Sequence, residues 1–218
     1  MRLALISGAI AVGVMCSSMM ASAAVIQPDS VINVSSEFNA SFAAENTING
    51  SGLTSNPRDP SEAHANYAGG NHWTTAAGTN PLDAFITWGF DSPTDLFGMY
   101  VWNHRSNIIS ANTGYEPTLF TLELFDGSNN SLLTLTNVSL LPDVATGQTI
   151  DFGGLVAGVS SIRFDVDAVQ SSPDFTGLAE VAFETSPITA VPVPAALPLL
   201  LTGLVGLSFL RRRGARIG

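Results

Sequence analysis

The sequence predicts an all-β fold, a sandwich or jelly roll, flanked by two terminal segments that do not belong to the fold. Three observations indicate this class. Short runs rich in β-branched and aromatic residues are separated by Gly, Asn, Asp and Pro, some of these runs alternate apolar and polar residues, and no long amphipathic helical stretch appears in the 218 residues. Chains with this pattern fold as packed antiparallel sheets.

The predicted strands follow in chain order, each bounded by residues that favour turns. The run 84–90 ends at Asp91, Ser92 and Pro93, and the run 118–125 ends at Asp126 and Gly127. In all, the sequence predicts eight strands, at 31–34, 84–90, 96–102, 118–125, 132–138, 149–152, 161–166 and 178–183.

Alternation identifies the core face of two strands. Phe120, Leu122 and Leu124 lie on one side of their strand, and Ile162, Phe164 and Val166 lie on one side of theirs. The segment 50–83 contains few strand signals. A connection of that length in a small domain is usually functional or mobile.

Charge is concentrated in the body, residues 24–190. This part contains three of the eight arginines and all 18 acidic residues, so its formal charge is −15 against −10 for the whole chain. Its length suits one domain with a core of its own. Because such an acidic body repels phosphate backbones, nucleic-acid binding is excluded as a function.

Residues 1–23 have the pattern of a cleaved signal peptide. A basic residue and an apolar run precede small residues that end in a cleavage site at Ala21 and Ala23. We expect signal peptidase to cleave there, so that the mature, exported chain begins near Ala24. The only cysteine, Cys16, leaves with the peptide, so the mature chain has no disulfide and no cysteine metal site.

Residues 191–218 have three parts. A motif of five residues precedes an apolar run, 196–210, and an arginine cluster follows. The motif and the cluster are Val191, Pro192, Val193, Pro194 and Ala195, then Arg211, Arg212 and Arg213. The apolar run and motif together predict a transmembrane helix with its arginines in the cytoplasm. A plain tail anchor would have the same hydropathy.

This three-part pattern resembles the PEP-CTERM class of bacterial sorting signals in its VPLPA variant, with Val193 in place of leucine. The resemblance implies that the chain is anchored in the inner membrane through the C-terminal helix and then processed by an exosortase. It also implies a final location at the cell surface or in the extracellular matrix.

No catalytic constellation appears in the body. The three histidines lack the short spacing of zinc ligands, and no G-x-S-x-G elbow or P-loop is present. Asp165 and Asp167 share one face of a strand, which is most simply the solvated face of an acidic protein. The sequence therefore predicts that the protein is not an enzyme.

The order of the remaining motifs resembles the discoidin, or coagulation-factor type C, domains of the galactose-binding-like superfamily. The resemblance spans about 31–184 and is carried by the loop NTINGSGL (46–53), the strand LFGMYVWN (96–103) and the closing GLAEVAF (177–183). It implies a jelly-roll β-sandwich whose two ends lie close together.

The resemblance also implies a structural Ca²⁺ site where the early loop meets the last strand. Asn49 stands where the family often has aspartate, Ser51 and Thr54 offer further oxygens, and Glu180 matches an acidic residue of the closing strand. Such a site would fasten the first and last segments together without a disulfide. Because Asn49 has no charge, the sequence predicts weak calcium binding or none.

Domains of this kind mostly bind glycans or lipid headgroups through loops at one end of the sandwich. Sugars stack on aromatic rings and bond to polar side chains. The predicted ligand-binding residues are His64, Tyr67, His72, Trp73, Asn103, His104 and Arg105, with Tyr115 as a further candidate. Trp88 and Trp102 are predicted to lie in the core, whereas Trp73 could belong to either set. Arg105 could equally form an internal salt bridge.

Three functions are compatible with these patterns. The first is a non-catalytic surface or matrix protein that binds polysaccharide. The second is a purely structural matrix component with no specific ligand. The third, and least supported, is a small secreted hydrolase.

Overall fold

The computed structural model describes residues 24–105, 114–172 and 174–185. The predicted signal peptide, the sorting signal and its membrane helix lie outside these residues. In the described ranges, no helix has the length and apolar character needed to cross a membrane. The helices there are short 3-10 turns, η1 (Ala40–Phe42), η2 (Ala44–Thr47) and η3 (Pro81–Asp83).

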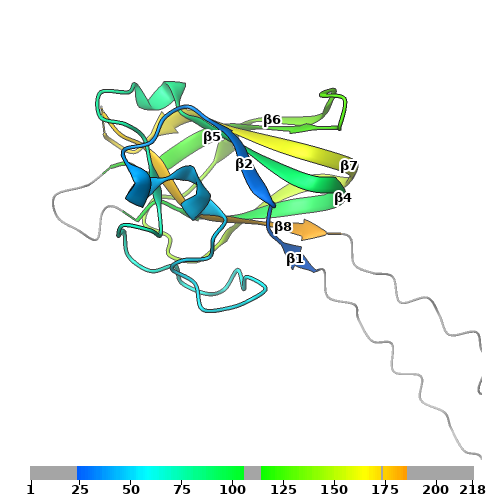
Figure 1. Cartoon of the computed structure of the whole chain (residues 1–218), viewed down its shortest axis with the longest axis horizontal. Coiled ribbons are helices and arrows are strands. Elements are labelled where there is room, and N and C mark those ends of the chain that lie inside the picture. Colours follow the sequence, from blue (N-terminus) through cyan, green and yellow to red (C-terminus); the bar gives the residue numbers. More distant parts are fainter. Residues whose placement is uncertain (1–23, 106–113, 173, 186–218) are drawn as a thin grey trace, which may run out of the picture. The chain divides into compact units, whose positions relative to one another are not determined.

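The described residues form an antiparallel β-sandwich, which confirms the predicted fold class (Figure 1). The strand order is β1-β8-β4-β7-β5-β6, with β2 beside β4 and β3 beside β8. The strands are β1 (Val25–Ile26), β2 (Ser30–Val34), β3 (Trp73–Thr74), β4 (Phe85–Asn103), β5 (Pro117–Phe125), β6 (Ser131–Ser139), β7 (Gln148–Val169) and β8 (Gly177–Thr185).

Strands β4, of 19 residues, and β7, of 22 residues, each join two strands that the sequence predicted as separate. The predicted break at Asp91–Pro93 is wrong, and so is the one between 152 and 161, because each lies inside a single continuous strand. The β4–β7 pairing instead shifts register between Gly89 and Gly98. The turn-forming residues therefore make β-bulges, which bend a strand without ending it.

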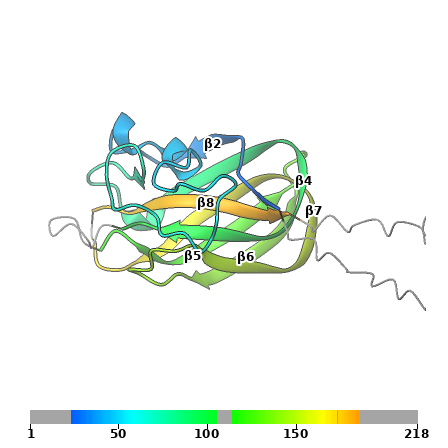
Figure 2. The ribbon, with the colours of Figure 1, turned by 90° about the horizontal axis from the view of Figure 1, so that it is seen from below.

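These bends pass β4 and β7 from one layer of the sandwich to the other. The first part of β4 pairs with β2 and with the last part of β7, which also pairs with β5. The second part of β4 pairs with β8 and with the first part of β7. Figure 2 shows β8 lying across the strands of the opposite layer.

The core lies between the two layers. Trp88 of β4 packs against Phe164 of β7 and Phe183 of β8, with ring centroids 6.1 and 6.3 Å apart. The predicted alternation is confirmed, since Phe120, Leu122 and Leu124 of β5, and Ile162, Phe164 and Val166 of β7, are all buried. Trp88 and Trp102 are buried, as predicted.

The register fixes two ends of the sandwich. At one end Leu96 pairs with Thr185 and Val25 with Glu184, and the Thr185 amide donates to the Ala24 carbonyl at 2.9 Å. The two ends of the described domain therefore meet there, as the resemblance implied. Asn103 pairs with Leu178 at the opposite end, about 20 Å away at ~3.3 Å per residue. We call this opposite end the loop end.

Candidate functional site: an aromatic circuit at the loop end

Six rings from five separate segments close into a circuit at the loop end, which we call the aromatic circuit. The circuit consists of Phe38, Phe42, Tyr67, His104, Tyr115 and Phe175. Each ring packs on the next, with centroid distances between 4.7 Å (Tyr67 to His104) and 6.0 Å (Phe38 to Phe175). The segments meet because β4 ends here and β5 and β8 begin here.

The circuit is open to solvent on one side. Phe38 is 46% exposed, and the other four carbocyclic rings are half-buried. His104 is fully buried beneath them. A group of exposed aromatic faces fixed by mutual packing can stack on the apolar faces of a ligand, with little loss of side-chain entropy on binding.

The three histidines of the protein pack together at the circuit, with His104 as one of its six rings. His72 lies between His64 and His104, 4.9 Å from each by ring centroids. One nitrogen of each ring has an oxygen partner, namely Ala65 O for His64, Asn71 Oδ1 for His72 and Thr74 Oγ1 for His104. The other nitrogen of each ring is buried without a hydrogen-bond partner.

Burial keeps these rings neutral. Desolvation lowers the pKa of His72 far below its ordinary range, and lowers that of His104 to about 3. The pKa of His64 is also lowered, first by desolvation and then by the nearby Arg105. The histidines therefore shape the floor of the site as uncharged groups. Within the described residues, no group of three or more His, Cys, Asp or Glu side chains could hold a metal ion.

The other predicted ligand-binding residues have structural contacts. Trp73 is fully buried and its indole donates to Ser36 O at 2.9 Å. Asn103 is buried and its amide donates to Pro117 O at 2.9 Å. Arg105 is half-buried and donates to His64 O. Of the predicted set and its further candidate, Tyr67 and Tyr115 are the aromatic side chains that reach the surface.

Three residues of the circuit were not predicted, namely Phe38, Phe42 and Phe175. Each is an isolated phenylalanine in a polar segment, outside any strand pattern. A large apolar side chain in a polar segment outside any strand indicates an exposed apolar surface. This was the signal in the sequence that could have identified the three phenylalanines. The pairing of these segments depends on the fold and could not be read from spacing.

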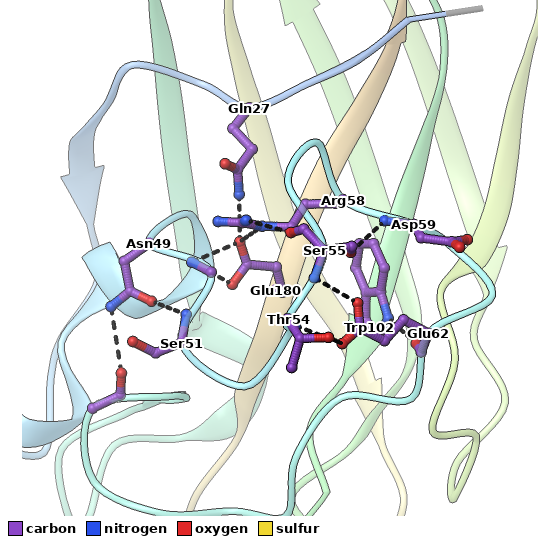
Figure 3. Close-up of polar contacts among 12 residues, drawn as sticks. Gln27, Asn49, Ser51, Thr54, Ser55, Arg58, Asp59, Glu62, Trp102 and Glu180 are labelled. Carbon is purple, nitrogen blue, oxygen red and sulfur yellow. Dashed lines mark hydrogen bonds and ion pairs between the residues drawn. The ribbon is translucent and has the colours of Figure 1, made fainter. Parts of the chain in front are cut away.

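A second polar site surrounds Glu180, on the outer face of β8 (Figure 3). Glu180 is fully buried. Its carboxylate accepts hydrogen bonds from the Gly50 amide at 3.1 Å, from Gln27 at 2.5 Å and from Arg58 at 3.3 Å. Burial raises the pKa of Glu180 to about 7, and Arg58 opposes that rise. The early loop and the last strand thus meet, as the resemblance implied.

The other predicted calcium ligands are directed elsewhere. The Asn49 oxygen accepts from the Ser51 amide at 2.7 Å, and the Thr54 hydroxyl donates to Glu62 at 2.7 Å. The contacts of Glu180 itself are all N–H donors, whereas Ca²⁺ requires six to eight oxygens at about 2.3–2.6 Å. The residues present therefore do not fit a calcium ion.

No family model matches this sequence, and no curated protein matches it. Solved structures do resemble it. The F5/8 type C domain of a Bacteroides fragilis protein is 16% identical, with 76% of this chain and 92% of that chain covered and a TM-score of 0.49. A carbohydrate-binding module named CBM32-3, from a family 31 glycoside hydrolase of Clostridium perfringens, is 16% identical. The match covers 74% of this chain and 91% of that chain, with a TM-score of 0.49.

A fucose-binding module of Streptococcus pneumoniae, SpX-3, is 15% identical, with 71% of this chain and 92% of that chain covered and a TM-score of 0.48. These structures are discoidin-type and carbohydrate-binding domains, the group that the sequence resembles.

Proposed function

We propose that the protein is a non-catalytic, surface-displayed domain that binds polysaccharide at the aromatic circuit. The circuit carries this proposal, because it is a solvent-facing group of packed rings on loops that a rigid sandwich holds in place. Sugar rings present apolar C–H faces that stack on such rings.

The charge of the domain narrows the class of ligand. Its formal charge of −15 repels uronate-rich or sulfated polysaccharides. We therefore expect a neutral or amino-sugar polysaccharide, and binding to an amino sugar should weaken as salt screens the attraction.

The two terminal signals supply the rest of the proposal. In this proposal the signal peptide directs export and signal peptidase removes it, and an exosortase then processes the tail from Val191 onward and releases the protein to the cell surface or matrix. Geometry supports display, because the domain's ends meet at the end of the sandwich opposite the aromatic circuit.

The test is a glycan array followed by calorimetry on the purified protein. We expect binding to neutral or amino-sugar polysaccharides, and a loss of about two- to twelvefold in affinity in Tyr67→Ala and in Phe38→Ala, since one stacked ring contributes about 0.5–1.5 kcal/mol. The matched control is Ile32→Ala, because Ile32 is an exposed apolar residue (58%) on β2, outside the circuit. Its affinity should be unchanged.

Two outcomes contradict this assignment. A blank array with correctly folded protein favours the purely structural matrix role. Turnover of a polysaccharide, abolished by changing one acidic residue, favours the hydrolase.

A further inference from the structure

Glu180 is the most deeply buried carboxylate of the contacts drawn in Figure 3. Its side chain has no exposed surface, and the strand that carries it is covered on this side by the early loop. An ionised carboxylate in such a place is costly unless a positive charge and hydrogen bonds accompany it.

Arg58 supplies that charge. Its Nε lies 3.3 Å from the Glu180 carboxylate, and its Nη1 donates to Ser55 O at 3.0 Å. Only 10% of the Arg58 side chain is exposed. The guanidinium is therefore fixed in one orientation by partners on both sides.

The backbone of the loop is shaped around this guanidinium. Gly50 has a φ of +74°, and a Cβ added there would lie 1.6 Å from Arg58 Nη2. Glycine is thus required for two reasons, the left-handed backbone and the space that the guanidinium occupies. The same glycine donates its amide to both oxygens of Glu180.

We propose that Arg58 takes the place of a bound cation and fastens the first and last segments of the domain without calcium. Gln27, Gly50 and Arg58, all from the first third of the chain, converge on Glu180 of the last strand. A calcium ion added beside Glu180 would face the guanidinium at close range, which like charges disfavour. Closure of this domain is therefore independent of metal.

The first measurement is thermal unfolding of the wild-type protein in millimolar calcium and in EDTA. We expect the two melting temperatures to agree within about 1 °C, because a ligand that does not bind the native state does not stabilise it. A rise of several degrees in calcium overturns the proposal.

The second measurement compares two arginine variants. Arg58→Met removes one partner of a buried pair and should lower the melting temperature by about 10 °C. Arg163→Met is the control, since Arg163 forms its 2.6 Å ion pair with Asp165 where both side chains are about one-third exposed, so that solvent weakens the pair, and methionine can keep the packing of this side chain on Phe85. We expect a shift of at most a few degrees there. Equal shifts in the two variants contradict the role of Arg58.

A double variant tests the pairing itself. Glu180→Gln removes the buried charge, so Arg58→Met in the Glu180→Gln background should cost clearly less than it does in wild type. Strict additivity contradicts the pairing. Should Arg58→Met fail to fold, the calcium and EDTA comparison on wild type still decides whether metal is needed.

Discussion

His104 illustrates, at the scale of single residues, how this protein uses uncharged polar groups. Its ring belongs to the aromatic circuit, where it contacts Tyr67 and Tyr115, and it also contacts His72. Among the described contacts, Thr74 is the one hydrogen-bond partner of the His104 ring. A protonated ring there would be a buried cation, which desolvation disfavours first and the neighbouring His64 disfavours next. The native state therefore requires the neutral form.

This requirement makes stability depend on pH. The pKa of His104 is about 3 in the folded protein against 6.5 for the ordinary ring, so between these values the unfolded state binds one more proton. The contribution of His104 is full above pH 6.5 and is lost progressively as the pH falls toward 3.

We expect His104→Asn to reduce the slope of unfolding free energy against pH, between pH 6.5 and 5, by up to about 1.4 kcal/mol per pH unit. Urea unfolding at several pH values measures this slope. Asparagine alters packing at every pH, so the slope, and not the absolute stability, is the criterion. An unchanged slope contradicts the neutral, buried state of His104.

At the scale of elements, the long strands β4 and β7 organise the domain. Each strand bends at its bulges and contributes one part to each layer. The pairing of β4 with β7 therefore belongs to both layers of the sandwich. Phe164 of β7 lies at the centre of this arrangement. It stacks on Phe120 of β5 at 4.5 Å and packs on Trp88 of β4 at 6.1 Å.

Phe164→Ala should therefore cost about 3–5 kcal/mol of stability, because it leaves a cavity between strands that cannot close over it. Leu132→Ala is the control, since Leu132 on β6 is 39% exposed, and its cost should stay below about 1 kcal/mol. Chemical denaturation of both variants gives the comparison. A loss under about 1.5 kcal/mol for Phe164→Ala would mean that the layers repack independently.

At the scale of the whole domain, the two ends of the described domain, at Ala24 and Thr185, lie at the end of the sandwich opposite the aromatic circuit. The ends are joined by hydrogen bonds between Ala24 and Thr185 and by the β1–β8 pairing. The Glu180 contacts hold the same first and last segments together further along β8. The contacts that join the first and last segments of the domain are therefore separate from the surface that we propose binds ligand.

A circular permutant tests this separation. A short Gly/Ser linker from Thr185 to Ala24, with new ends in the exposed turn at Gly127–Asn129, should fold with a melting temperature within about 5 °C of wild type and with unchanged glycan affinity. Thermal unfolding and calorimetry check both. Loss of folding would show that the order of the strands, and not only their contacts, is needed.

The sequence alone determined the fold class and the core faces of the strands. The alternation of Phe120, Leu122 and Leu124 gave the buried side of β5, because a period of two places every second side chain on one face. The resemblance of the sequence to discoidin-type domains also identified the early loop and Glu180 as partners. Turn residues misplaced two boundaries, since Asp91–Pro93 form a bulge that only strand pairing reveals.

Tertiary structure decided which side chains are available. Trp73 and Asn103 were predicted to contact ligand, but they lie inside the domain with their polar groups bonded, and nothing in their sequence context reports that burial. Phe38, Phe42 and Phe175 became a site only where five loops meet. Arg58 faces Glu180 from 122 positions away. A local sequence pattern indicates the structure of the segment in which it occurs. A site depends on contacts between segments, and these contacts form only when the chain folds.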